Sequence, residues 1–226
     1  MSLFFYWFLV FFIYATIGWM LEMISTFLYT KKVTNRGFLM GPYCPIYGTA
    51  ALLMIILLGK YEHDLPVLFG MSFLLSTILE YITSYLMEKI FRARWWDYSD
   101  RTFNINGRVC LKNCFFFGIL GILLLAYVHP FIRASLLYLC SDAPKYFYII
   151  ATFCFTVFII DLITSFKITI GLKRNLQNLK KDCTDEISKK VQETLAAGSK
   201  SIQRLFKAFP NMKPLKLNKK KKSHLF

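Results

Sequence analysis

Five long apolar stretches occupy most of the chain up to Phe166 and limit what it can fold into. They run from Leu3 to Tyr29, Gly41 to Gly59, Leu65 to Met87, Asn113 to Phe131 and Tyr146 to Phe166. A helix of about 20 apolar residues crosses the roughly 30 Å hydrocarbon layer of a bilayer, because each residue advances it by about 1.5 Å. With 56% hydrophobic and only 18% charged residues, the chain is too apolar for an ordinary soluble domain. We therefore predict an all-α, polytopic membrane helix bundle of five transmembrane helices.

The Lys and Arg residues are unevenly distributed among the segments that connect these stretches. If the chain crosses the membrane five times, 25 of them lie on one side and 3 on the other. Cytoplasmic loops are enriched in basic residues. The distribution therefore predicts a multi-pass protein of the cell membrane with its N-terminus outside and its C-terminus in the cytoplasm. The first stretch has no basic leader and is too long for a cleaved signal peptide, so we expect it to remain as a span.

The end of the chain differs in composition from the transmembrane bundle that we predict for residues 1–170. Between Leu172 and Leu195, apolar residues recur every three or four positions among charged ones, which predicts a cytoplasmic amphipathic helix. Residues 171–226 also include a polybasic run, Lys219 to Lys222. Each basic residue near anionic lipid contributes about 1 kcal/mol of attraction. We expect this tail to bind anionic lipid and not nucleic acid, because no aromatic or motif context accompanies the lysines.

Ionisable side chains inside the predicted spans are the first candidates for function. Glu22, Glu80 and Asp161 lie within the first, third and fifth spans, where each costs at least about 2.5 to 3.5 kcal/mol at mid-membrane. All three fall in the half predicted to face the cytoplasm. The two long connections on that side add further polar groups: Arg36, Glu88, Arg94, Asp97, Asn104 and Arg108. We predict that these nine residues line a water-filled, cytoplasm-facing pocket that binds a substrate.

Structural explanations stay open for some of these residues. A carboxylate near the membrane edge, such as Glu22, Glu88 or Asp97, often only pairs with a nearby arginine. Glu80 and Asp161 lie farther from water, which favours a function. His129, before Pro130, is expected to pack at the outer end of the fourth span. The six cysteines form no CxxC pair, so we expect reduced thiols and neither a metal nor another cofactor.

The same residues carry a family resemblance. The motifs are Gly18-Trp19-x-x-Glu22, Asn35-Arg36-Gly37-Phe38-Leu39-x-Gly41-Pro42-x-Cys44-Pro45-Ile46-Tyr47-Gly48, Glu80-x-x-Thr83-Ser84-x-x-Met87-Glu88, Arg94-x-Trp96-Asp97-Tyr98 and Asn104-x-x-Gly107-Arg108. Between about Phe12 and Pro130, the chain resembles the ABC-transporter type IV family, the CmpB-like integral membrane proteins. The resemblance implies a permease-like membrane subunit of a transporter. It leaves the fifth span, with Asp161, outside the matched region.

The resemblance also implies partners. The sequence has no G-x-x-x-x-G-K-[ST] loop to hold nucleotide phosphates, so a separate cytoplasmic ATPase subunit would have to supply the energy. Five spans are few for a translocation path, which favours a homodimer.

Three kinds of function are open at this point. The first is transport, with a pocket that binds a polar or ionic solute. The second is an intramembrane enzyme acting on a lipid or lipid-linked substrate at the inner leaflet. In that case paired carboxylates would be acid and base, and Arg36, Arg94 and Arg108 would grip a phosphate. The third is a membrane scaffold that recruits partners through its basic tail. Buried charge and the family resemblance favour transport, and whether the chain is an enzyme stays open.

Overall fold

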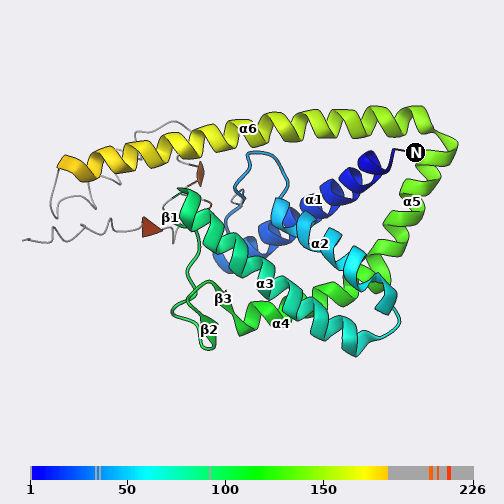
Figure 1. The fold of residues 1–226 in the computed structure, drawn as a ribbon, viewed down its shortest axis with the longest axis horizontal. Coiled ribbons are helices and arrows are strands. Elements are labelled where there is room, and N and C mark those ends of the chain that lie inside the picture. Colours follow the sequence, from blue (N-terminus) through cyan, green and yellow to red (C-terminus); the bar gives the residue numbers. More distant parts are fainter. Residues whose placement is uncertain are drawn as a thin grey trace, which may run out of the picture.

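The computed structural model is helical along most of its length (Figure 1). It describes residues 2–33, 35, 37–91, 93–182, 204–205, 208 and 213–214. The helices are α1 (Leu3–Thr30), α2 (Pro45–Leu58), α3 (Leu65–Phe91), α4 (Leu111–Ile122), α5 (His129–Asp142) and α6 (Pro144–Asp182). A 3₁₀ turn, η1 (Gly59–Tyr61), follows α2, and a π-helical turn, η2 (Leu123–Val128), joins α4 to α5. The short strands are β1 (Ala93–Arg94), β2 (Asn104–Ile105), β3 (Val109–Cys110) and β4 (Lys213–Pro214).

Four helical segments in the described part of the chain are long and apolar enough to cross a membrane. They are Leu3–Thr30, Leu65–Phe91, Leu111–Asp142 and Pro144–Gly171, so the prediction of a helical membrane protein is confirmed. The predicted second span, Gly41 to Gly59, is instead a shorter apolar helix, Pro45–Tyr61 when η1 is included. With 14 residues, α2 alone is about 21 Å long. Gly41 and Cys44 each precede a proline, which disfavours helix there, and Pro45 then begins the helix.

The helices α1 to α4 run in alternating directions between two ends of the molecule (Figure 1). The connections 31–44 and 93–110 lie toward one end, which we call the basic end because Lys31, Lys32, Arg94, Arg101 and Arg108 belong to them. The turn η1 and the start of α6 lie at the other end. From the end of α4, α5 turns toward the start of α6, which runs back along one side of the bundle.

The helix of the fourth predicted span continues beyond Phe131 to Asp142. Pro130 has no N–H for the α-helical pattern, and the π-helical turn η2 lies directly before it. The backbone N–H of His129 donates to the carbonyl of Leu124 across that turn. The His129 ring packs against α1, with its Nδ1 3.4 Å from the Tyr14 hydroxyl.

Small residues let α1 and α2 approach closely. A Cβ atom on Gly48 would lie 2.6 Å from the Phe11 carbonyl oxygen, and one on Gly18 would overlap the Tyr47 ring. On the other side of the bundle, a Cβ atom on Gly118 of α4 would lie 2.7 Å from the Phe69 ring of α3. Helices in a membrane associate largely through such close backbone packing. Glycine therefore fixes two helix pairs that surround the interior.

We predict that Gly48→Ala lowers the free energy of unfolding by about 1–3 kcal/mol, because the added methyl group meets backbone that has no room to move. The matched control is Gly70→Ala in α3, where a Cβ atom meets nothing within 4 Å. That change is expected to be neutral or to stabilise the helix by up to about 1 kcal/mol. The thermal unfolding temperature of each purified protein tests this. Equal shifts for the two variants would contradict the packing explanation.

Candidate functional site

A cavity of about 1080 Å³ extends from the basic end, between α1, α2, α3 and α4, as far as η2. Leu162 and Phe166 of α6 also line it. Most of its wall is apolar. Its polar lining includes Glu22, Tyr47, Ser76, Glu80, Thr83, Asp97, Tyr98 and Asn113. The volume is at the upper limit of the 300–1,000 Å³ typical of small-molecule sites, which are also mainly apolar with a few placed polar groups. The cavity is therefore the candidate site.

Glu80 is the most deeply buried acidic group in the cavity wall, with 7% of its surface exposed. The side chains of Tyr98 and Asn113 hydrogen-bond to its carboxyl group. Its Oε2 atom is buried and has no hydrogen-bond partner among the residues that the structure describes. Leaving a buried acceptor unsatisfied costs free energy. A ligand with a hydrogen-bond donor would satisfy this atom.

Glu22 faces the same cavity from α1. The Tyr47 hydroxyl donates to its Oε1 atom at 2.7 Å, and Gly18, one helical turn earlier, leaves room for the Tyr47 ring. Tyr98 lies near both carboxylates. Burial raises the pKa of its hydroxyl far above the ordinary value, and the negative charges of Glu80 and Glu22 raise it further. Tyr98 therefore stays protonated and remains a hydrogen-bond donor at neutral pH.

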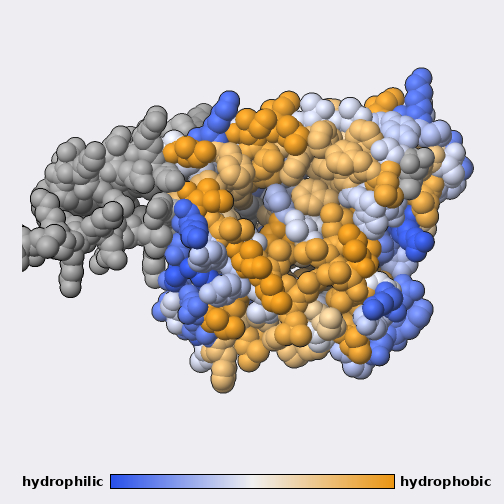
Figure 2. Space-filling model, viewed as in Figure 1, coloured by the Kyte–Doolittle hydropathy of each residue, from blue (hydrophilic) through white to orange (hydrophobic). Residues whose placement is uncertain are grey.

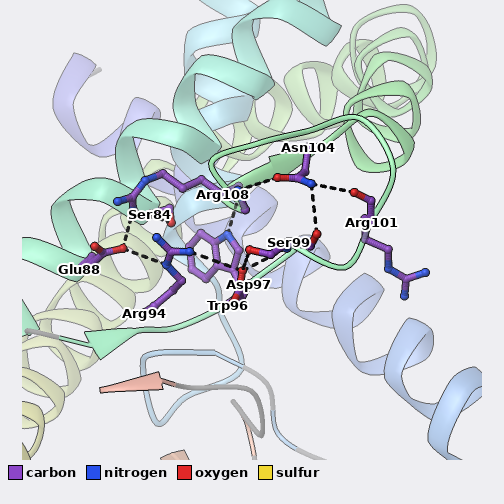
Figure 3. A network of polar contacts seen from close by, with 10 residues as sticks. Ser84, Glu88, Arg94, Trp96, Asp97, Ser99, Arg101, Asn104 and Arg108 are labelled. Atoms are coloured by element: carbon purple, nitrogen blue, oxygen red, sulfur yellow. Dashed lines mark hydrogen bonds and ion pairs between the residues drawn. The ribbon is translucent and has the colours of Figure 1, made fainter. Parts of the chain in front are cut away.

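A second polar cluster surrounds Glu88, and Figure 3 shows its members together. The Oε2 atom of Glu88 lies 3.1 Å from Nε of Arg94 and 2.9 Å from Nη1 of Arg108. Arg108 also donates to the Ser84 hydroxyl at 3.3 Å and lies over the Tyr85 ring. Both arginines are thus engaged by Glu88, and neither lines the cavity. The cluster clamps the 93–110 segment onto α3.

Asn104 shapes the turn that brings Arg108 to Glu88. Its Oδ1 atom accepts the Gly107 N–H at 2.9 Å, and its Nδ2 atom donates to the Arg101 carbonyl at 2.8 Å. Asn106 and Gly107 have φ values of 53° and 66°, the left-handed region that glycine and asparagine tolerate best. This turn joins β2 to β3. Asn104 therefore orders the hairpin and does not line the cavity.

Asp97 contacts the clamp around Glu88 and also lies in the cavity wall. Its Oδ1 atom lies 3.5 Å from Nη1 of Arg94 and accepts hydrogen bonds from the N–H and the hydroxyl of Ser99, at 3.1 and 2.6 Å. It also lines the cavity. Asp97 therefore connects the clamp around Glu88 to the cavity wall.

Asp161, on α6, lies outside the cavity wall and holds the 37–44 segment in place. Its two carboxylate oxygens accept the backbone N–H groups of Met40 at 3.0 Å and Gly41 at 2.7 Å. The Tyr43 and Ser165 hydroxyls donate to the same carboxylate at 2.8 and 2.9 Å. Four donors leave Asp161 fully engaged.

The structure thus brings Glu22, Glu80 and Asp97 together at the cavity and groups Glu88, Arg94, Asn104 and Arg108 in or around the clamp. Arg36 and the polybasic run lie outside the described residues. Residues 172–182 of the predicted amphipathic helix continue α6, and its residues 183–195 also lie outside the described residues. Sequence reasoning missed Tyr47, Tyr98 and Asn113 as cavity groups. Asn113 had a usable signal, a lone amide at the start of an apolar span.

A piece of the tail reaches the basic end. Arg204 donates to the carbonyls of Leu39 at 2.7 Å and Phe38 at 3.2 Å. Leu205 is buried against Phe91 and Trp95, and the neighbouring strand β4 pairs with β1. The tail therefore covers part of the cavity's basic end. Among the described residues, no group of three His, Cys, Asp or Glu side chains is placed to hold a metal ion.

Long apolar helices around a cavity with buried carboxylates define a multi-pass membrane protein. The model of the family described as putative ABC-transporter type IV matches residues 9–166, so the chain belongs to that family. The match extends beyond Pro130 and includes the fifth predicted span and Asp161. No curated protein matches the chain. No solved structure matches it either.

We predict that Asp161→Asn loosens the 37–44 segment, because an amide retains one acceptor oxygen and loses the charge that strengthens these bonds. Cys44 reports the change. It is buried, so reagents reach its thiol slowly. In a variant that keeps Cys44 as its single cysteine, we expect alkylation to become about tenfold faster. Asp142→Asn, at the exposed end of α5, is the control; an unchanged rate in Asp161→Asn would contradict the anchoring role.

Proposed function

We propose that this protein is the permease-like membrane subunit of a transporter and that its cavity binds the polar or charged part of a solute. The observation that carries the proposal is Glu80, a buried carboxyl group in the cavity wall with one oxygen left without a partner. Such a group in a membrane protein is costly unless it is used. Glu22 and Asp97 complete the acidic surface that the solute meets.

The proposed topology has five passes through the cell membrane, with the basic end in the cytoplasm. The short helix α2 crosses with the help of the extended residues 37–44, whose backbone groups are satisfied by protein. Irregular backbone is tolerated at membrane depth where protein satisfies it in this way. Residues 1–170 form the bundle. Residues 171–226 form the cytoplasmic amphipathic helix and polybasic tail, which bind anionic lipid.

Single-cysteine labelling tests this topology. We expect cysteines replacing Lys60 and Lys145 to react with a membrane-impermeant thiol reagent from outside the cell, and one replacing Arg101 to react only after permeabilisation. If α2 does not cross, Lys60 and Lys31 lie on the same side. Matching accessibility of cysteines at positions 31 and 60 would therefore refute five passes.

The proposed energy source is a separate ATPase subunit that docks on the 93–110 segment. This segment carries exposed Arg101 and Asp100 and is held rigidly by the clamp around Glu88. Two copies of the chain, with two ATPase subunits, would make a complete transporter.

Transport is favoured over lipid chemistry by the arginine positions. A lipid-phosphate enzyme would need guanidinium groups aimed at the substrate. Of the three arginines expected in that role, Arg94 and Arg108 are bound to Glu88, and Arg36 lies outside the described residues. The scaffold alternative depends on the basic tail, most of which lies outside the described residues.

We predict that Glu80→Gln leaves ATPase association intact but abolishes the stimulation of ATP hydrolysis by solute. The change is isosteric and keeps an acceptor oxygen for the Tyr98 hydroxyl. The tagged protein, purified in mild detergent with its native partners and reconstituted, is assayed with a panel of solutes. Glu62→Gln, near the opposite end, is the matched control. The proposal fails if no ATPase accompanies the wild-type protein, or if Glu80→Gln is stimulated as strongly.

A further inference from the structure

We propose that the solute is an uncharged amphiphile, a hydroxyl-bearing head group on an apolar body, and that Ser76 and Glu80 of α3 bind its head group. This inference rests on the proposed transport function and names the substrate class of the same cavity. Three features carry it: two buried polar atoms without partners, the pairing of the charged groups in the wall, and an opening through the apolar side of the molecule.

Ser76 and Glu80 lie one helical turn apart on α3, and both line the cavity. They are 6% and 7% exposed. The Oγ atom of Ser76 and the Oε2 atom of Glu80 have no hydrogen-bond partner among the residues that the structure describes. Side chains four positions apart on a helix have their Cβ atoms about 5–6 Å apart, so one small head group can reach both. A hydroxyl group both donates and accepts hydrogen bonds, which suits a carboxyl oxygen and a serine hydroxyl together.

The free hydroxyl of Ser76 is unusual for an apolar helix. A serine or threonine hydroxyl in a helix can donate to the carbonyl one turn earlier, and Thr77 donates in this way to Phe73 at 2.7 Å. Ser72 also has no partner within the described chain. However, its hydroxyl is packed against α4, where a Cβ atom on Gly121 would overlap it, and it does not line the cavity. Of the two serines, Ser76 is therefore the one that a ligand in the cavity can reach.

The other acidic groups inside the cavity already have partners in the protein. Glu22 accepts a hydrogen bond from Tyr47 at 2.7 Å, and Asp97 lies 3.5 Å from Nη1 of Arg94. The carboxyl group of Glu80 accepts hydrogen bonds from two uncharged side chains. Burial in a mainly apolar wall disfavours charge on a ligand or on the group that it meets. Hydrogen bonds between uncharged groups are therefore the contacts that this wall favours.

The edge of the cavity at the 93–110 segment does not favour either sign of charge. Asp100 and Arg101 line it there, and both are exposed. They are adjacent and opposite in charge, so their fields largely cancel for an approaching ion. The selective contacts are then the hydrogen bonds at Ser76 and Glu80.

The cavity opens through the apolar side of the molecule. Leu86 and Ile90 of α3 and Phe166 of α6 line it while being 48%, 47% and 37% exposed. The two helices meet at the basic end, where the ring centroids of Phe91 and Phe166 are 5.7 Å apart, and they diverge from there (Figure 1). Figure 2 shows a hollow in this face, surrounded by hydrophobic residues. In a membrane span these side chains face lipid, so a ligand with an apolar body can enter from the bilayer.

A binding experiment tests this substrate class without the ATPase. The full-length protein is placed in nanodiscs of phosphatidylcholine and titrated with a brominated long-chain alcohol, with the matched brominated alkylammonium ion or with the matched alkyl sulfate. Bromine quenches tryptophan fluorescence at contact, and Trp95 and Trp96 line the cavity. We expect saturable quenching by the alcohol, and for the two ions only the linear quenching that follows partition into lipid.

Three variants separate the binding site from the fold. Loss of one hydrogen bond predicts that Ser76→Ala weakens binding of the alcohol about three- to tenfold. Glu80→Gln exchanges the free acceptor oxygen for an N–H donor and should weaken it similarly. Ser72→Ala, the same change outside the cavity wall, should bind as the wild-type protein does. Neither serine hydroxyl has a partner to lose within the described chain, so we expect both alanine variants to keep the thermal unfolding temperature of the wild-type protein.

Absence of saturable quenching by the alcohol, equal affinity for either ion, or wild-type affinity in Ser76→Ala or Glu80→Gln would overturn the inference. Stimulation of ATP hydrolysis by a water-soluble ion, with no saturable binding of the alcohol, would overturn the substrate class and leave the transport function standing. Binding of the alcohol without any associated ATPase would confirm the ligand class and overturn the transport function.

Discussion

Backbone groups that leave helical structure and are shielded from water must find partners in the protein, and the 37–44 segment meets this demand through Asp161. Without water, each unsatisfied N–H or carbonyl costs several kcal/mol. The carboxylate on α6 accepts the N–H groups of Met40 and Gly41, and Arg204 donates to the carbonyls of Phe38 and Leu39. The segment so fixed determines where α2 begins. Tyr47, near the start of α2, is thereby placed over Gly18 and within reach of Glu22.

The buried carboxylates of this protein differ in how many hydrogen bonds and ion pairs they receive. This difference distinguishes carboxylates that hold the fold together from the one proposed to bind a ligand. Asp161 receives four hydrogen bonds, and Glu88 is held by two arginines. Glu80 is buried as well, yet one of its oxygens has no partner within the described chain. Burial alone does not separate these cases, because a buried charge is stable when fully paired. The unmatched acceptor is the observation on which the proposed ligand contact of Glu80 rests.

The sequence alone was sufficient to predict a helical membrane protein. The length of an apolar stretch and the distribution of charged residues around it depend directly on whether lipid or water surrounds the helix. It also singled out Glu22, Glu80 and Asp97, which line the cavity, since an ionisable group in or beside an apolar stretch is visible without a fold. It could not tell that Asp161 faces a loop while Glu80 faces a cavity, because that depends on which helix packs beside each residue. Nor could it foresee that Arg94 and Arg108 would meet on Glu88, because the turn at Asn106 and Gly107 brings Arg108 back to α3.

The shortness of α2 and the existence of the cavity have one cause. Two prolines delay the helix until Pro45, so no helix fills the space between α1 and α3 at the basic end. Phe38, Cys44 and Tyr47 line that space from one side, and Trp95 to Tyr98 line it from the other. A second helix that began before Pro45 would occupy part of this space, so the late start of α2 leaves room for the cavity beside Glu80.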